Sequence, residues 1–457
     1  MKKIIFFLLV ILPILLGVFY IYYLSIFQKI YIEPPAITPS PPLAEGSPPK
    51  DELSFLKDFQ SFREELMLTR QNFLEVNLPH MKLRLYKNGE ISKEIPVLRR
   101  GDPQMWGGTA AGLYKAIAKY RSAYSNASQV FMPYSIHFYG KYYIHGEPFY
   151  PAGGALISET SGGCVQLQNQ NAKTIFNEAE TGMPILVIDK ENDDYIYSLQ
   201  KITELPRISA ESYLVADVGS GFIFTEKNSK EKLPIASLTK LMTAVVVAEN
   251  VDLQRSVQVK QWMLESYGYT QGLEAGERFN VAELFYPLLI ESSNDAAEVL
   301  GSILGKEQTI KLMNEKAKSI LMPDTEFVDP HGFAPENIST SQDFFYLARY
   351  ILINRPPIWK ITRGEEGSSF AEVSFKNLNN KNLFFDSSNF IGGKTGFIAT
   401  SGYNGIFLFS FNTKEGTKRD VAIVLLGSKG LKLGWDNLKK DVEKIDTWLE
   451  ENYFSKQ

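Results

Sequence analysis

The stretch from Ile235 to Lys240 constrains this chain more than any other, because it places a hydroxyl and an amine three residues apart where a helix begins. Residues at positions i and i+3 share one face of a helix. Pro234 suits a helix entry, and Leu241–Ala248 is apolar on nearly every side, which predicts a buried helix whose N-terminal end opens into a site. There Ser237 would be a nucleophile, with Lys240 as its base.

Two further polar elements follow in the order that an active-site serine requires. The S-x-x-K spacing alone is a weak signal, since it also occurs at Ser54–Lys57 and Ser198–Lys201. Ser292-Ser293-Asn294, however, lies between two helical runs, and Lys394-Thr395-Gly396 opens a strand-rich segment. The set resembles the S-x-x-K, S-x-N and K-T-G motifs of the serine D-Ala-D-Ala carboxypeptidases, the low-molecular-weight penicillin-binding proteins, from about Ile208 to the C-terminus.

This resemblance implies a role for each residue of the three motifs. Ser237 would attack the carbonyl of the penultimate D-Ala, Lys240 would take its proton, and the acyl-enzyme would then be hydrolysed. Lys240 can be a base only if burial and nearby charge lower its pKa, and Lys394 is the predicted cationic neighbour. The other implied roles are a proton relay at Ser292, a peptide contact at Asn294, carboxylate contacts at Lys394 and Thr395 beside Gly396, and oxyanion-binding N–H groups at Ser237 and Phe397.

The second half of the chain, residues 208–457, has the pattern of an α+β domain, with helices packed around an antiparallel sheet. Strands are predicted at Tyr213–Asp217, Phe222–Glu226, Lys394–Ile398, Gly402–Phe411 and Val421–Gly427. Further helices are predicted at Val281–Glu291, Asp295–Leu304, Glu307–Ile320 and Trp435–Tyr453. Asp329-Pro330-His331-Gly332 resembles the N-P-x-G turn of the same family, and we assign His331 a structural role.

A second chemical centre lies between residues 72 and 207, where strand patterns predict a mostly β domain. Cys164 follows two glycines, which let a backbone approach closely and present N–H groups as an oxyanion hole. A thiol becomes nucleophilic when a neighbouring imidazole favours the thiolate, and His145 is the nearest histidine in sequence. A lone cysteine is more often a small buried apolar residue, so both interpretations stay open. The predicted elements are strands at Phe73–Val76, Lys82–Tyr86, Ile91–Leu98, Tyr134–Ile144 and Pro184–Ile188, and a helix near Asn171–Glu180.

The pattern as a whole resembles the YkuD-type L,D-transpeptidase catalytic domain over about Phe73–Asp189, which carries an H-G and then an S-x-G-C. Gly108-Thr109-Ala110-Ala111-Gly112 matches its T-P-x-G turn except for an alanine in place of proline, and Met132-Pro133-Tyr134 leads into the histidine strand as in the family. The implied site consists of Cys164 as nucleophile, His145 as its base, the Gly146 carbonyl as the group that orients the imidazole, and Ser161 and Gly163 as lining residues.

Two residues depart from that family. Gly162 stands where the family usually has histidine, and Gln166 stands where it often has arginine. The first change removes a polar group beside the oxyanion site, and the second removes a cation for a substrate carboxylate. Rate and substrate preference are therefore left open, and a domain that only holds substrate is the alternative to an active L,D-transpeptidase.

The N-terminus predicts a membrane anchor and a stalk. Ile4–Phe27 is an uncharged run of 24 residues, enough to span the roughly 30 Å core of a bilayer at about 1.5 Å per residue. Lys2 and Lys3 would keep the N-terminus cytoplasmic and place the rest outside, with a cleaved signal peptide as the alternative. Residues 1–30 are thus assigned to the anchor, and residues 31–71 to a proline-rich spacer ending in a short amphipathic helix within Asp51–Leu68.

Composition excludes several function classes. A net charge of −4, from 48 basic and 52 acidic residues, offers no basic face for nucleic acid. Four histidines and one cysteine argue against a structural zinc site and rule out an internal disulfide, and we expect no metal or cofactor.

Together these features predict a membrane-anchored cell-wall enzyme that acts outside the cytoplasm on peptidoglycan stem peptides and is inhibited by β-lactams. The resemblances imply that a D,D-carboxypeptidase site makes the tetrapeptide that an L,D-transpeptidase site uses as its donor. A β-lactam sensor is one alternative, although a cytoplasmic stub of three residues offers no signalling domain. A serine β-lactamase is another, although no separate glutamate motif can be assigned as a deacylating base.

Overall fold

The computed structural model describes residues 56–156, 158–191, 193, 195–197, 202–264, 273–365, 375, 377–429 and 434–454. The predicted anchor and most of the predicted stalk lie outside these residues. Within the described residues, no helix has both the length and the apolar character needed to cross a bilayer. The helix predicted from Asp51 begins only at Phe59, because Asp58 caps it by accepting hydrogen bonds from two backbone N–H groups of its first turn.

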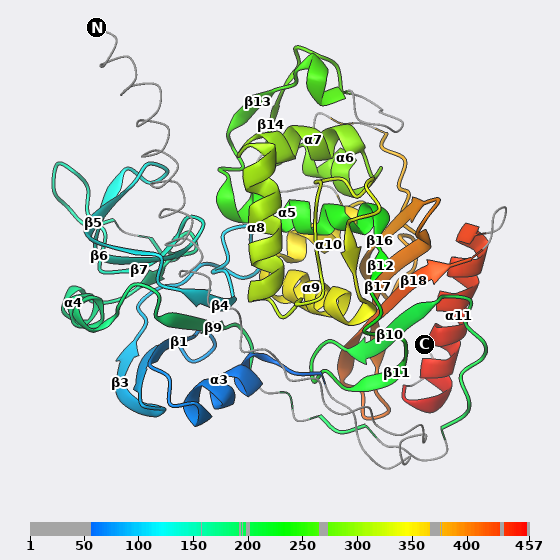
Figure 1. Cartoon of the computed structure of the whole chain (residues 1–457), viewed down its shortest axis with the longest axis horizontal. Helices are drawn as coiled ribbons and strands as arrows, with labels where there is room; N and C mark the ends of the chain where they lie inside the picture. Colours follow the sequence, from blue (N-terminus) through cyan, green and yellow to red (C-terminus); the bar gives the residue numbers. More distant parts are fainter. Residues whose placement is uncertain are drawn as a thin grey trace, which may run out of the picture. The chain divides into compact units, whose positions relative to one another are not determined.

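The domain that follows this helix, α3 (Phe59–Leu68), contains two sheets (Figure 1). The first has the order β3-β2-β1-β9-β4, with β1 parallel to β9 and the other pairs antiparallel. Its strands are β1 (Phe73–Asn77), β2 (Lys82–Lys87), β3 (Glu90–Pro96), β4 (Gly112–Lys115) and β9 (Pro184–Ile188). The second has the order β5-β6-β7-β8 and contains β5 (Ala118–Ser125), β6 (Val130–Tyr139), β7 (Tyr142–His145) and β8 (Val165–Gln166).

The second sheet corrects one sequence prediction. Tyr134–Ile144 is not one strand, because Gly140 turns the chain with a positive φ of 47° and separates β6 from β7. The turn brings β7 back against β6, and β8 then pairs with β7 in parallel so that His145 lies beside Gln166. The histidine and cysteine segments therefore meet at one sheet. The predicted helix is α4 (Asn169–Glu178), which begins two residues earlier than expected.

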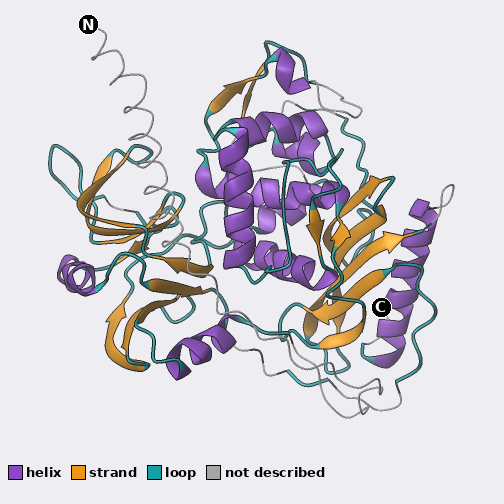
Figure 2. Cartoon of the chain, in the orientation of Figure 1, coloured by secondary structure: helices purple, strands orange, loops and turns teal. Residues whose placement is uncertain are grey.

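The second domain is α+β, as predicted, and its five-stranded antiparallel sheet has the order β11-β10-β18-β17-β16. Alternate residues of β18 face opposite sides. Val421, Ile423 and Leu425 pack with the closing helix, while Ala422, Val424 and Leu426 face the other helices. Helices thus cover both faces of this sheet (Figure 2). The strands are β10 (Ser212–Asp217), β11 (Ile223–Lys227), β16 (Phe390–Ile398), β17 (Gly402–Asn412) and β18 (Lys418–Ser428).

The helices of this domain include two that were not predicted from the sequence. The predicted members are α5 (Thr239–Asn250), α6 (Phe285–Leu289), α7 (Asn294–Ser302), α8 (Lys306–Ser319) and α11 (Gly434–Asn452). The unpredicted ones are α9 (Ser341–Asn354) and α10 (Pro356–Thr362). Small elements complete the domain: β12 (Leu233–Pro234), β13 (Ser256–Gln258), β14 (Arg278–Asn280), β15 (Ile338–Ser339) and the 3₁₀ turns η2 (Ala236–Leu238) and η3 (Gln261–Leu264).

The two domains belong to one compact unit, Leu53–Gln457. A single apolar cluster runs through both of them, and Trp106 of the first stacks on Phe285 of the second at 4.9 Å between ring centroids. The connection after β9 is also bound to the second domain, because Tyr197 packs in its core and donates a 2.7 Å hydrogen bond to Asp217. The domains are therefore packed together rather than joined only by a linker.

Candidate active sites

Ser237 lies on the 3₁₀ turn η2, which leads directly into α5. The turn is strained, since Ala236 adopts a positive φ of 50°. Gly332 makes this turn possible, because a Cβ at that glycine would lie 1.9 Å from the Ala236 carbonyl oxygen. The prediction of a helix start is thus confirmed in refined form: the serine precedes the helix, and Lys240 is the second residue within it.

Lys240 is fully buried and binds three oxygens. Its Nζ donates to Asn294 Oδ1 at 2.7 Å and to the His331 carbonyl at 2.7 Å, and it lies within hydrogen-bond distance of Ser237 Oγ, at 2.8 Å. Burial lowers the pKa of Lys240 well below its ordinary value, and the charge of Lys394 lowers it further. Both predicted causes of a lowered pKa are present, and both favour the neutral amine that can accept the Ser237 proton.

The other two motifs converge on the same place. Ser292 lies on the connection before α7 with a positive φ of 63°, and its Oγ accepts a 2.9 Å hydrogen bond from Lys394 Nζ. Burial lowers the pKa of Lys394 to about 7, with a further contribution from the charge of Lys381. Gly396 has no room for a side chain, because its Cβ would lie 2.8 Å from the Ser237 nitrogen. Strand β16 therefore runs directly past the nucleophile.

The remaining residues of this site differ in exposure. Thr395 is buried, and its hydroxyl donates to the Lys381 carbonyl at 3.1 Å. The Phe397 side chain is 45% exposed at the end of the same strand and lies 4.4 Å from Tyr403 between ring centroids. Asn294 begins α7 and contacts the lysine base directly, which adds a contact to the predicted role of holding a peptide.

Two residues of the serine site were missed from the sequence. His331 was assigned a structural role, and its ring does contact Glu298 at 3.1 Å, but its carbonyl also binds the lysine base. Lys381 carries no motif and is exposed, yet its charge lowers the pKa of Lys240 and of Lys394. A backbone carbonyl and a long-range charge leave no signature in a residue pattern.

Cys164 lies in a glycine-dependent loop before β8. Gly162 and Gly163 have positive φ angles of 66° and 119°, and a Cβ on Gly163 would lie 2.5 Å from Tyr142 Cε1. The Ser161 hydroxyl donates to the Cys164 carbonyl, which closes the loop. Cys164 is a partly exposed residue, and its thiol donates to the Lys141 carbonyl at 3.7 Å. The glycines thus serve the close backbone approach that the sequence predicted.

His145 ends β7 and is buried. Its Nδ1–H donates to the Gly146 carbonyl at 2.5 Å, which confirms the predicted orienting contact and leaves Nε2 as the acceptor. Among the described residues, no hydrogen bond joins the His145 ring to the Cys164 thiol. The imidazole is therefore oriented for base chemistry without being engaged with the nucleophile.

The charge states of Cys164 and His145 differ from the sequence expectation, in which the imidazole favours the thiolate form of the cysteine. Burial raises the pKa of the Cys164 thiol to about 11, against smaller lowering effects of a backbone hydrogen bond and of Lys141. Burial also lowers the pKa of His145 to about 4. Both groups are consequently neutral near pH 7, so rapid alkylation of Cys164 at neutral pH is not expected of the free protein.

Gln166, which replaces the arginine usual in the resembled family, is 2% exposed. Its Oε1 accepts a 3.2 Å hydrogen bond from Arg99, and its backbone N–H donates to the Arg99 carbonyl at 2.9 Å. A partly exposed guanidinium from another segment thus lies beside the position where the sequence lacks a cation. The sequence could not reveal this, because Arg99 is 65 residues before Cys164.

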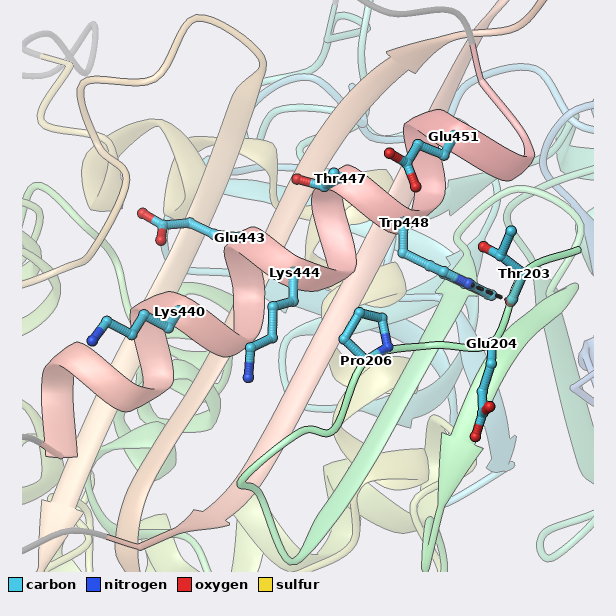
Figure 3. A pocket seen from close by; sticks show the side chains of 9 residues that line it. All are labelled: Thr203, Glu204, Pro206, Lys440, Glu443, Lys444, Thr447, Trp448 and Glu451. Carbon is cyan, nitrogen blue, oxygen red and sulfur yellow. Dashed lines mark hydrogen bonds between the residues drawn. The ribbon is translucent and has the colours of Figure 1, made fainter.

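One surface hollow is lined by none of the predicted site residues, and the described residues contain no cluster suited to a metal ion. No group of three or more histidine, cysteine, aspartate or glutamate side chains suited to a metal occurs in the part of the chain that the structure describes. A hollow on α11, where Trp448 Nε1 donates to the Thr203 carbonyl at 2.8 Å, contains none of the predicted site residues (Figure 3).

Comparison with known proteins matches both domains. Residues 199–430 match the D-alanyl-D-alanine carboxypeptidase family, and residues 71–187 match the L,D-transpeptidase catalytic domain. D-alanyl-D-alanine carboxypeptidase DacC of Escherichia coli (strain K12) is 30% identical over 266 residues, which are 55% of this chain and 64% of DacC. A D-alanyl-D-alanine endopeptidase of Haemophilus influenzae is 33% identical over 216 residues, which are 46% of this chain and 73% of the relative.

A solved structure gives a similar coverage. The D-alanyl-D-alanine carboxypeptidase from Mycobacterium tuberculosis H37Rv aligns with a TM-score of 0.48 and 24% identity over 55% of this chain and 94% of that chain. The present chain spans less than two thirds of the length of DacC.

Proposed function

The chain belongs to the D-alanyl-D-alanine carboxypeptidase family and also carries an L,D-transpeptidase catalytic domain, and from this premise we propose that it is a peptidoglycan enzyme with two active sites. The serine site would remove the terminal D-Ala from pentapeptide stems. The cysteine site would then use the resulting tetrapeptide as the donor for L,D-transpeptidation.

The observation that carries the proposal for the serine site is the buried Lys240 amine, 2.8 Å from Ser237 Oγ and with a lowered pKa. As Oγ forms a bond to the carbonyl carbon, its proton passes to Nζ and then to the leaving D-Ala nitrogen as the peptide bond breaks. Water hydrolyses the resulting ester and restores the hydroxyl. A β-lactam would acylate the same oxygen, which makes β-lactams the expected inhibitors.

At the cysteine site, Cys164 would attack the carbonyl that precedes the terminal D-Ala of a tetrapeptide. Because His145 is neutral and presents Nε2 as an acceptor, it can receive the thiol proton as the carbon–sulfur bond forms. D-Ala leaves with that proton, and an acceptor amine then cleaves the thioester to form the L,D-linkage. Gly163 and Ser161 shape the loop that presents the nucleophile.

A second candidate for this domain is peptide binding without chemistry. One observation favours it: the thiol is neutral and is not hydrogen-bonded to His145 in the described structure. Incubation of the full chain with tetrapeptide and an acceptor amine separates the two candidates. An L,D-linked product that disappears in Cys164→Ala supports the enzyme, whereas binding without product supports the holding domain.

For the whole protein, conversion of a pentapeptide to a tetrapeptide by the purified chain tests the carboxypeptidase assignment. A β-lactam sensor would bind penicillin without this conversion, and a serine β-lactamase would hydrolyse penicillin rapidly instead. We further propose that residues 1–30 anchor the protein in the cell membrane, with both catalytic domains outside. A tag after Gln457 should then be accessible to protease on intact cells, while a soluble product starting beyond Phe27 would refute the anchor.

A further inference from the structure

The contact between the two domains contains three fully buried charges. Glu249 at the end of α5 receives Lys316 of α8 at 3.0 Å and Arg355, between α9 and α10, at 2.9 Å. One carboxylate thus faces two cations, and the excess positive charge needs further acceptors, since a buried charge without partners is strongly destabilising. Tyrosines supply them.

Two of these acceptors come from the first domain. Lys316 Nζ donates to Tyr114 at 2.9 Å, and Arg355 donates to the Tyr142 hydroxyl at 2.8 Å. Burial raises the pKa of Tyr142, so its hydroxyl stays protonated and serves as a neutral acceptor. A cation of the carboxypeptidase domain is therefore bound to the strand β7 that carries His145.

Tyr142 also determines the course of the cysteine loop. Its ring lies against Gly163, so closely that a Cβ there would be 2.5 Å from Cε1. The residue before it, Lys141, accepts the Cys164 thiol at its carbonyl and extends its Nζ to the Ala248 and Val251 carbonyls at 3.4 and 3.3 Å. Two adjacent residues thus connect the nucleophile's loop to the C-terminal end of α5.

We propose that Arg355 is a positioning residue of the cysteine site, which it influences through the Tyr142 hydroxyl and the ring that supports Gly163–Cys164. The cysteine site is then incomplete without the carboxypeptidase domain. This inference rests on the proposed cysteine chemistry for its consequence in activity, but the geometry of the loop can be tested without any peptide substrate.

The test uses the fact that Cys164 is the only cysteine of the chain, so thiol alkylation reports on this loop alone. The titratable groups that face it are Lys141, Tyr142 and Tyr143, with His145 on the same strand. In the full-length Tyr142→Phe protein the ring loses its link to Arg355. We expect the pH midpoint of alkylation to fall by about one unit, which is roughly tenfold more thiolate at a given pH, while formation of the L,D-product decreases.

Arg355→Met provides a second variant that leaves the Glu249–Lys316 pair balanced in charge, and it should shift the alkylation profile in the same direction. Arg355→Lys, which keeps a cation, should restore the profile in part. Tyr139→Phe is the matched control, because this interface hydroxyl binds Asn250 at 3.4 Å and not the arginine. Penicillin labelling of Ser237 should be unchanged in every variant.

Three outcomes would overturn the inference. The alkylation profile could be unchanged in Tyr142→Phe and in Arg355→Met. The Tyr139→Phe control could shift it equally. Both variants could also lose penicillin labelling together with the alkylation change, which would mean that the pair only holds the domains together. If the wild-type protein formed no L,D-product but the alkylation profiles shifted as expected, the proposed transpeptidase function would fail while the positioning role would hold.

Discussion

The serine and cysteine sites differ in how far the free protein has assembled them. At the serine site the base already binds the nucleophile, with 2.8 Å between Lys240 Nζ and Ser237 Oγ. At the cysteine site His145 is oriented by the Gly146 carbonyl, but the Cys164 thiol donates to the Lys141 carbonyl instead. One site has its catalytic pair in hydrogen-bond contact, whereas in the described residues the two members of the other pair are bonded to different backbone carbonyls.

Burial acts in the same direction at both sites and has opposite consequences. It favours the neutral form of an ionisable group. For Lys240 the neutral amine is the active base, so the lowered pKa prepares the site for reaction. For Cys164 the neutral thiol is the weaker nucleophile, so the pKa of about 11 keeps the site at rest. Burial therefore prepares a lysine base for reaction, whereas a buried thiol must lose its proton during the reaction.

The largest expected effect separates the sites completely. Ser237→Ala removes the oxygen that forms the acyl-enzyme, so covalent penicillin labelling and release of D-Ala should both be abolished. The alkylation of Cys164 should not change, because the serine is not among its contacts. Labelled penicillin followed by gel electrophoresis measures the first effect, and residual labelling equal to wild type would contradict the assignment.

Removing the base of the serine site should have the next largest effect. Lys240→Ala should slow acylation of Ser237 by roughly 100- to 10,000-fold, the range attached to a general base. The rate of acylation by penicillin, followed in time, gives this factor. A rate within a factor of two of wild type would show that another group takes the serine proton.

The resting state of the cysteine site predicts slow thiol chemistry. With a pKa of about 11, well above that of an ordinary exposed thiol, Cys164 should be alkylated on the order of a hundredfold more slowly than such a thiol at pH 7. The rate should rise with pH until about pH 11, and unfolding should remove the difference. Fast alkylation at neutral pH would mean that Cys164 is already a thiolate, so that both sites would hold their reactive group in its active protonation state.

The smallest effect concerns the charge that sequence patterns missed. Lys381→Ala removes a cation that lowers the pKa of Lys240 and of Lys394, so both pKa values should rise. Because acylation requires neutral Lys240, its rate falls as pH decreases through that pKa, and this decrease should move to higher pH in the variant. We expect a several-fold lower rate on the acidic limb of the pH profile.

The matched control for this charge is Lys440→Ala, which removes an exposed lysine from α11, on the opposite face of the sheet. Its pH profile should overlay that of wild type. If Lys381→Ala behaves like this control, the charge of Lys381 does not lower the pKa of Lys240, and the lowering comes from burial and from Lys394 alone.

Sequence reasoning found the motif residues but not the distances between the motifs. Ser237, Ser292 and Lys394 were assigned to one site from their order alone, and the structure brings them together because β16 passes the nucleophile's turn. The strand prediction at Tyr134–Ile144 is confirmed only in part, since the positive φ of Gly140 divides the run into β6 and β7. Local patterns carry the chemistry, whereas turns decide which segments meet.

Other features of the sites lay beyond any pattern. The helix α9 was missed, although its sequence is rich in apolar residues, because they occur on nearly all sides and obscure the helical period. The neutral state of Cys164 depends on burial by residues distant in the sequence, and the link from Arg355 to Tyr142 joins positions 213 residues apart. Such contacts are properties of the packed unit and not of the motifs.

We propose that the two sites act in sequence, and packing within one compact unit would raise the local concentration of the tetrapeptide at the cysteine site. The most direct measurement gives the full chain a pentapeptide and an acceptor amine and follows the L,D-linked product by mass spectrometry. Wild type should form it, Cys164→Ala should stop at the tetrapeptide, and Ser237→Ala should form none until tetrapeptide is supplied. If Ser237→Ala cross-links pentapeptide as well as wild type does, the sequential account is wrong.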